Sequence, residues 1–242
     1  MIHRRRRATR RPRRRVVKRR RVRRVPRGLG QGGFTIVRAG LQAGVSCSSA
    51  GNIQALGISG STHRSLQFGT PVLAFTTGYL SRVYDVPFAI DFQLNDVVGV
   101  ADLTAIADGY RIRKVVIEWH GYNQSGVNGD VNYQPCNFIE YIVDHDDSTI
   151  PTIGTFQEKM GTKTVGFNQL GMAKLRCSPK IPALLNGSVP TYNTRTPFID
   201  MAYPSATHYS IKGILRNVSL YDTKSLGMKV NFKYTVDVRG LQ

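Results

Sequence analysis

The sequence predicts an all-β fold: a single jelly-roll (an antiparallel β-sandwich) with long loops and a disordered, arginine-rich N-terminal arm. Three observations predict it. Segments with an apolar residue at every second position recur along the chain, with little helical periodicity between them. The connections are long and rich in Gly, Ser, Asn and Pro, as in sandwiches and jelly rolls rather than alternating βαβ units. The excess positive charge is confined to the first 27 residues, which leaves 215 residues for one core.

The N-terminal arm, residues 1–27, is a segment that no packed core can hold. It contains fifteen arginines and Lys18, and the first carboxylate of the chain is Asp85. The arginines repel one another and little apolar surface offsets the cost of ordering, so we expect disorder until a polyanion condenses the arm. The expected nucleic-acid-binding residues are Arg4, Arg5, Arg6, Arg7, Arg10, Arg11, Arg13, Arg14, Arg15, Lys18, Arg19, Arg20, Arg21, Arg23, Arg24 and Arg27.

The rest of the chain is almost neutral. Of 34 basic and 15 acidic residues, sixteen basic and no acidic ones lie in the arm, so the body carries 18 and 15. A basic tail on a neutral body is typical of non-specific nucleic-acid binding. Arginine grips phosphate oxygens without reading sequence, and the arm has no aromatic residue for base stacking. The run Lys18–Arg24 also has the composition of a nuclear localisation signal.

The chain divides into three parts. The arm is followed by a glycine-rich hinge, residues 28–33, and by the jelly-roll domain, residues 34–242. The hinge, GLGQGG, matches G-x-G-x-x-G but lacks the preceding strand and following helix of a dinucleotide-binding loop. We therefore expect a flexible connection, because glycine leaves the backbone free.

The first half of the domain contains one clear strand. Residues 34–45 are expected to be a strand, and residues 46–82 are expected to be loops with one or two short strands. From Tyr84 to Leu94 apolar and polar residues alternate, which predicts a strand with one buried face. Pro87 cannot donate a hydrogen bond, so it suggests an edge position or a bulge.

A short helix and a basic strand are expected next. Residues 95–107 could form the helix, with Asn95 as its cap. The strand, Tyr110–His120, carries a second basic spot, Arg111, Arg113 and Lys114. Strict alternation puts Arg111 and Arg113 on the face of Trp119, with Lys114 on the other face. These three residues either decorate a strand end or extend an interior surface that faces nucleic acid.

The second half is expected to add strands joined by long loops. Residues 178–206 hold five of the eleven prolines and are expected to form a long irregular loop. The chain should contain eight or nine strands in all. The later ones are expected at Asn137–Val143, Lys163–Phe167, Met172–Cys177, Tyr209–Val218 and Met228–Arg239.

The sequence favours neither a metal site nor an enzyme. The acidic run Asp144, His145, Asp146 and Asp147 could ligate a metal, but it lacks the EF-hand spacing. It is better explained as a polar loop or as a charge partner for another subunit. No catalytic motif is present, so we expect no enzymatic activity and no cofactor. We also expect no membrane insertion, because no run of eighteen apolar residues occurs.

Three features together resemble circovirus-type capsid proteins, the coat proteins of small viruses with circular single-stranded DNA. They are the arginine-rich N-terminus, the strand Tyr110–Val115 (YRIRKV), and the last strand, which ends in Tyr234–Gly240 (YTVDVRG). The order of features agrees along nearly the whole chain. Residues 46–82 and 178–206 match nothing in the family pattern.

The resemblance implies a viral capsid protein with a jelly-roll subunit. It implies about sixty copies in a T=1 icosahedral shell, a single-stranded DNA genome bound by the arm, host nuclear import receptors, and a cell-surface attachment factor such as an anionic glycan. The expected locations are the virion and, during assembly, the host cell nucleus. Sixty arms would bring about 960 positive charges, enough for on the order of a thousand phosphates. The alternative is a non-assembling nuclear or ribosome-associated nucleic-acid-binding protein with a basic tail.

Overall fold

The structure is a computed structural model, and parts of the chain lie outside the residues it describes. Residues 1–27 and the hinge up to residue 32 lie outside them, so the predictions for the arm and the hinge stay predictions. The described residues are 33–47, 53–57, 63–77, 81–121, 136, 138–158, 161–168, 171–185, 189–192, 197–220 and 228–241.

One antiparallel sheet is built around the last strand of the chain. Its central order is β10-β7-β15-β2-β3, and β1 pairs with the same side of β15 as β2 does, further along the strand. β13 pairs with β7 beside β10. The bounds are β1 (Phe34–Ala39), β2 (Ala43–Cys47), β3 (Ile53–Leu56), β7 (Ala107–Gly121), β10 (Met172–Cys177), β13 (Ile199–Asp200) and β15 (Met228–Leu241).

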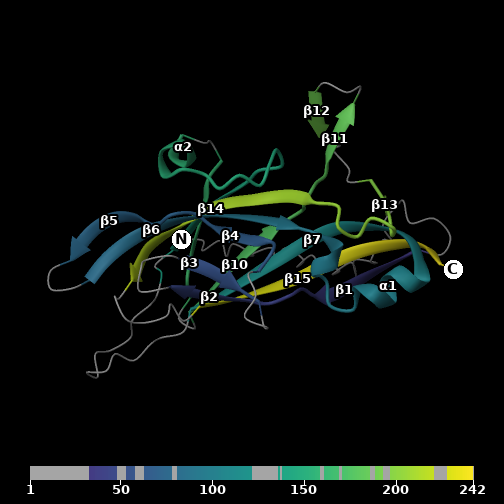
Figure 1. Cartoon of the computed structure of the whole chain (residues 1–242), viewed down its shortest axis with the longest axis horizontal. Helices are drawn as coiled ribbons and strands as arrows, with labels where there is room; N and C mark the ends of the chain where they lie inside the picture. The colour runs from purple at the N-terminus through teal and green to yellow at the C-terminus, as the bar shows by residue number, and fades with distance from the viewer. Residues whose placement is uncertain are drawn as a thin grey trace, which may run out of the picture.

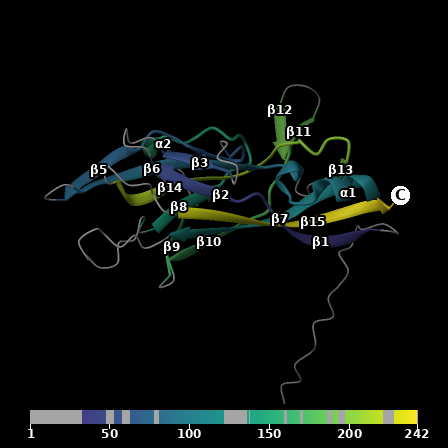
Figure 2. The same cartoon turned by 60° about the horizontal axis from the view of Figure 1, so that its bottom comes forward.

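The second antiparallel sheet has the order β4-β6-β14-β8-β9, with β5 on the same side of β6 as β4. The two sheets lie face to face (Figures 1 and 2). The bounds are β4 (Leu66–Phe68), β5 (Val72–Thr77), β6 (Ser81–Phe92), β8 (Phe138–Val143), β9 (Lys163–Gly166) and β14 (His208–Leu220).

The strand order is that of a jelly roll. If β1 and β2 are counted as one interrupted strand, the first principal strand pairs with the last, β15, and the second, β6, pairs with the last but one, β14. Each sheet then holds four principal strands, and the chain passes repeatedly from one sheet to the other. The predicted fold class is confirmed.

The core lies between the two sheets and is rich in aromatic residues. Trp119 of β7 packs against Phe88 of β6, with ring centroids 5.3 Å apart. Phe92 of β6 meets Tyr234 of β15 edge to face at 5.9 Å, and all of these side chains are fully or almost fully buried. Such pairs add specific geometry to the apolar burial. The buried face predicted for the strand from Tyr84 to Leu94 is confirmed, with Phe88 and Phe92 on it.

Pro87 lies within an internal strand, opposite a break in its neighbours. β4 pairs with β6 as far as Phe88, and β5 begins to pair at Asp85. The carbonyl of Pro87 accepts a hydrogen bond from the amide of Gly69. In an antiparallel sheet the backbone nitrogen and carbonyl of one residue point toward the same neighbouring strand. The nitrogen of Pro87, which has no hydrogen to donate, therefore faces the break between β4 and β5. The edge position suggested by the sequence is wrong, although Pro87 does mark an irregularity of the sheet.

A β-bulge in β7 corrects the predicted face of the basic strand. The register with β15 pairs Lys114 with Thr235 and Ile112 with Val236, which leaves Arg113 without an opposite residue. The extra residue restores the alternation, so Ile112 joins Val115, Ile117 and Trp119 in the core. Arg113 is exposed and lies 4.0 Å from Asp237 on the outer side of the sheet. Strict alternation had placed Arg113 on the core face, which is wrong.

The helical prediction holds, but its cap does not. A 3₁₀ turn, η1 (Leu94–Asp96), is followed by the helix α1 (Val100–Ile106). The residue before α1 is Gly99, with a φ of 78°, whereas Asn95 lies within η1. Gly99 adopts the left-handed conformation that other residues avoid, which takes the turn into the helix without a side-chain cap.

The long segments expected to be irregular contain short elements. Residues 46–82 include β3, β4 and β5, more strands than expected. The proline-rich segment contains the hairpin β11 (Pro182–Leu185) and β12 (Val189–Tyr192), as well as β13. α2 (Ile153–Gln157) lies between β8 and β9. Within the described part of the chain no helix is long and apolar enough to span a membrane.

Candidate nucleic-acid interface

The described chain begins at the edge of the β7–β15 sheet. Phe34 of β1 is paired with Val238 of β15, and Thr35 with Asp237. The Thr35 hydroxyl donates a hydrogen bond of 2.6 Å to the Asp237 carboxylate. The arm therefore joins the body at this edge, next to the outer face of the sheet.

The outer face of this sheet is the side that turns away from the core. On β15, Val230, Phe232, Tyr234 and Val236 are buried against the second sheet, so the residues between them point outward. Residues directly opposite in neighbouring strands share a face. We call this surface the basic face. Its charged members are Arg111, Arg113, Lys114, Glu118, Lys174, Arg176, Asp200, Lys229, Lys233, Asp237 and Arg239.

The basic face has eight cationic side chains and three carboxylates. One row across the sheet places Arg176 of β10, Val116 of β7 and Lys233 of β15 side by side. Arg176 and Lys233 are exposed, as are Arg113 and Lys114. The excess of positive charge in front of the sheet favours a polyanion. All three residues of the sequence-predicted basic spot, Arg111, Arg113 and Lys114, lie on this face.

Arg111 has a structural role in addition to its charge. Its guanidinium donates to the Asp237 carboxylate at 2.6 Å, and Asp237 is completely buried. The ring of Phe198 lies against both Arg111 and Arg239, with each guanidinium carbon 4.7 Å from the ring centroid. Arginine over an aromatic ring gains cation–π attraction. The contact of Phe198 with two arginines could not be found from the sequence, because these three residues are far apart along the chain.

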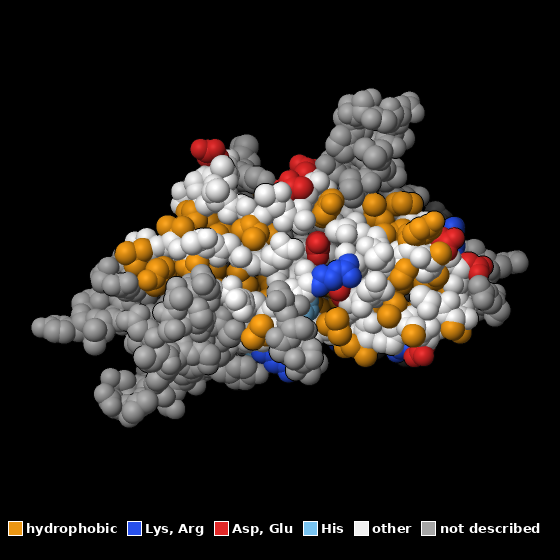
Figure 3. Space-filling model, in the orientation of Figure 1, with side chains coloured by type: hydrophobic (Ala, Val, Ile, Leu, Met, Phe, Trp, Pro, Cys, Tyr) orange, Lys and Arg blue, Asp and Glu red, His pale blue; other side chains and the backbone are white. Residues whose placement is uncertain are grey.

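The opposite side of the molecule is acidic. The strands of the second sheet and the segment 144–158 carry seven carboxylates against three cations, among side chains that the structure describes. In Figure 3 acidic side chains lie along the upper edge near α2, whereas basic ones lie at the lower edge, where an acidic one is also seen, and at the centre of this view. These charged residues are Asp85, Asp91, Glu140, Asp144, Asp146, Asp147, Glu158, Lys163, Lys212 and Arg216. The body is therefore nearly neutral in total, but the described charges are polarised between its two outer faces.

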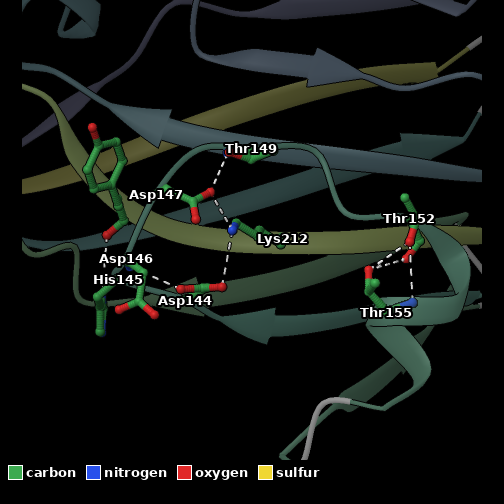
Figure 4. A network of polar contacts seen from close by, with 9 residues as sticks. Asp144, His145, Asp146, Asp147, Thr149, Thr152, Thr155 and Lys212 are labelled. Atoms are coloured by element: carbon green, nitrogen blue, oxygen red, sulfur yellow. Dashed lines mark hydrogen bonds and ion pairs between the residues drawn. The ribbon is translucent and has the colours of Figure 1, made fainter.

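The acidic run that could have bound a metal is tied to a lysine. Lys212 of β14 is buried, and its ammonium lies 3.2 Å from the Asp144 carboxylate and 2.6 Å from that of Asp147 (Figure 4). Burial lowers the pKa of Lys212, but the hydrogen bonds with Asp147 and Asp144 outweigh it and raise the pKa above its ordinary value. Ile150 of the same segment contacts the position of Gly69. The ion pairs therefore fix residues 144–158 over the second sheet.

A second cation, which is partly buried, fixes the other end of that sheet. Arg216 of β14 contacts Asp85 of β6 at 2.6 Å and Glu140 of β8 at 2.7 Å. Asn217, with a φ of 56°, donates its backbone amide to Asp85 at a bulge between β14 and β6. One guanidinium thus links three strands where β14 changes direction.

Glu118 is paired with a cation on the neighbouring strand of the basic face. Glu118 forms an ion pair of 2.5 Å with Lys174 of the neighbouring strand. The hydrogen bond with Lys174 lowers the pKa of Glu118 below its ordinary value. Both residues of the pair lie on the basic face, where Glu118 neutralises one cation.

A partly buried acidic site lies where β6 ends. Asp96 is buried and accepts hydrogen bonds from the Ser65 hydroxyl at 2.6 Å and from the backbone N–H of Gln93 at 2.9 Å. Asp91 has a buried carboxylate oxygen, Oδ1, without a hydrogen-bond partner in the structure. Burial, together with the charge of Asp96, raises the pKa of Asp91 to about 6. Ionised Asp91 is therefore unfavourable for the fold at neutral pH.

Other candidates for chemistry are absent from the described residues. No group of three or more His, Cys, Asp or Glu side chains among them has the arrangement of a metal site. Cys136 and Cys177 are reduced thiols in the interior, and burial raises the pKa of Cys136 to about 12. Such a thiol is inert, because the thiolate is the reactive form. The side chain of Cys47 lies outside what the structure describes.

The fold resembles that of a viral capsid protein. No family model and no curated protein sequence matches the chain. The capsid protein of BFDV, a circovirus, in the crystal structure of its 60-mer, has 15% sequence identity and a TM-score of 0.53; the match covers 86% of this chain and 93% of that one. The decameric form of the same protein gives 16% identity, 86% and 99% coverage, and a TM-score of 0.46. The 60-mer comparison confirms the sequence-based resemblance at the level of the fold; at such identity it shows the fold alone.

Replacing Lys212 by methionine should destabilise the body strongly. It removes both ion pairs and leaves Asp144 buried without its cation, which costs about 3–5 kcal/mol of unfolding free energy. Asp147→Asn is the matched control: this carboxylate is half exposed, so the loss should stay below about 1 kcal/mol. Chemical denaturation of both variants measures the difference. Equal losses would contradict the assigned role of Lys212.

Replacing Asp91 by asparagine should stabilise the protein at neutral pH but not in acid. The folded-state pKa of Asp91 is raised, so its ionisation makes the fold less stable as the pH rises from about 4 through 6. Asn cannot ionise. We expect a gain of about 1–2 kcal/mol at pH 7.5, discounted for partial exposure, and almost none at pH 3.5. Melting temperatures at both pH values give the result, with the exposed Asp102→Asn as control; a gain independent of pH would contradict it.

Proposed function

We propose that this chain is the capsid protein of a small virus and belongs to the circovirus-type coat proteins. In this function the jelly-roll bodies self-assemble, with about sixty copies in a T=1 icosahedral shell, and the arms package single-stranded DNA. The arrangement that carries the proposal is a body with a capsid-like fold whose basic arm joins it at the edge of its basic face. The protein has a structural role and no catalytic one.

The arm and the basic face would act together on the nucleic acid. The sixteen cations from Arg4 to Arg27 would bind phosphates without reading the bases. The arm starts beside Thr35 and Asp237, so a strand held by the arm would pass the basic face. There, Arg113, Arg176 and Lys233 would add contacts at fixed positions. The acidic side of the body would then face away from the genome.

The remaining partners follow from the same proposal. The arginine-rich arm, with Lys18–Arg24, would also be the nuclear localisation signal that host import receptors recognise. The protein would occur in the virion and, during assembly, in the host cell nucleus. The outer surface of the shell would bind a host attachment factor, for which an anionic glycan is one candidate.

Deleting residues 2–27 should abolish DNA packaging without unfolding the body. We expect the affinity for single-stranded DNA at low salt to fall at least a hundredfold, because sixteen phosphate contacts are lost. A control in which all fifteen arm arginines become lysine keeps the charge and should keep most of the affinity. Titration with a labelled oligonucleotide at several salt concentrations measures both, and electron microscopy shows whether the shells are empty.

The residual binding of the deleted chain tests the contribution of the body. Lys233→Glu on the basic face should reduce this residual affinity for DNA by about tenfold, whereas Lys163→Glu on the other sheet should not.

The non-assembling alternative requires a chain that stays a monomer or dimer with or without DNA. Full-length protein that never forms particles would therefore overturn the capsid proposal.

A further inference from the structure

Half-exposed apolar side chains gather at two opposite ends of the molecule. At one end, Val72 and Leu73 of β5 are 49% and 50% exposed. At the other end, Val98 is 53% exposed and Ile106 of α1 is 43% exposed. Both views place β5 and α1 at opposite ends of the long axis, and Figure 3 shows hydrophobic side chains over each end. A single chain cannot cover one of these surfaces with the other.

The first surface is a ribbon of three strands that extends past the rest of its sheet. The pairing of β8 with β14 ends at Arg216, but β14 and β6 stay paired as far as Leu220 and Arg82, and β5 runs beside them. We call residues 72–77, 81–85 and 217–220 the β5 ribbon. The partly buried Arg216, bound to Asp85 and Glu140, fixes its base.

The edge of the β5 ribbon is built for a neutral, apolar partner. Val72 and Leu73 are consecutive strand residues, so they point to opposite faces, and both are half exposed. The sequence of β5, VLAFTT, has no charged residue. Among the described strands only β6 pairs with β5, so its other edge keeps free backbone groups. Edge strands that stay unpaired usually carry charges or proline to prevent association, and β5 does not.

The second surface surrounds η1 and α1, and backbone hydrogen bonds hold its parts together. The amide of Leu41 donates to Asp96, and the amide of Val98 donates to Ala39. The turn that carries Tyr203 is tied to Asn95 and Asp108 through Pro204 and Met201. We call Leu41, Val98, Ile106 and Tyr203 the α1 end. These four side chains are between 43% and 65% exposed, and none is charged.

We infer that the β5 ribbon of one subunit docks on the α1 end of a second copy of this chain. The inference rests on the proposed function, since it names the contact by which the bodies would assemble. Neither β5 nor the four residues of the α1 end include a charged side chain, so the two edges match each other in apolar character and offer no cations of their own to nucleic acid. Two different patches in contact form a heterologous interface, which repeats from copy to copy; in a closed shell the rotation between copies must close it into a ring.

Single charges placed on either surface should stop assembly. Leu73→Asp and Val98→Asp should each raise the protein concentration required for particle formation by tenfold or more. Gln157→Glu is the control, because Gln157 of α2 is exposed but lies outside both surfaces and outside the basic face, and it should assemble like the unmodified chain. Circular dichroism checks folding, and Leu73→Ser replaces Leu73→Asp if the charged variant does not fold. Normal assembly of the Leu73 and Val98 variants would overturn the inference.

Mixing the two variants tests whether the contact is head to tail. Each variant alone should be a monomer by sedimentation. A mixture has one intact β5 ribbon, on the Val98→Asp chain, and one intact α1 end, on the Leu73→Asp chain, so it should form heterodimers and nothing larger. Dimers of either variant alone would show a contact between like surfaces and overturn the inference. If the unmodified chain forms shells and the Leu73→Asp and Val98→Asp variants form them equally well, only the inference fails. If the unmodified chain never assembles, the proposed function is overturned as well.

Discussion

The pairing of β7 with β15 is the interaction on which the rest of the structure depends. It runs from Met228 opposite Gly121 to Leu241 opposite Ala107, and it joins the middle of the chain to its end. One side of this pair supplies Trp119, Phe232 and Tyr234 to the core. The other side carries most of the cations of the basic face. A shift of register by one residue would exchange the two sides, so the apolar core and the charged face are specified together.

Charge is distributed so that a nearly neutral body has two unlike faces. The carboxylates near α2 are partly matched by buried or partly buried cations, with Lys212 between Asp144 and Asp147 and Arg216 between Asp85 and Glu140. On the basic face, the described ion pairs join Asp237 to Arg111 and Glu118 to Lys174, and they leave most of the cations of that face unmatched. The electrostatic potential in front of the basic face therefore stays positive near Phe34, where the described chain begins. In the proposed function, this polarity would orient the bodies relative to a bound polyanion without a large net charge that repels neighbouring copies.

The sequence predicted the fold class and the long alternating strands, because period-two burial in β6 and β15 reflects local geometry. It could not predict features that depend on partners distant in sequence. The bulge at Arg113 exists only in the register with Thr235 and Val236, and it moved Ile112 into the core. The partner of Asp144 and Asp147 is Lys212, some 65 residues away. The strands of residues 46–82 are short edge pieces without strong alternation. For the candidate site, the sequence identified Arg111, Arg113 and Lys114, whereas Arg176, Lys233 and Arg239 joined them only through the strand pairing.

The central claim is that assembled bodies enclose their arms, and the accessibility of the arm to trypsin tests it most directly. Trypsin cleaves after arginine, and residues 4–27 offer it many sites. Nuclease-treated particles, freed of DNA, are compared with the non-assembling Leu73→Asp subunit under the same conditions. The account predicts that mass spectrometry finds the chain intact in particles and the arm removed from free subunits. Removal of the arm at equal rates from both would contradict it.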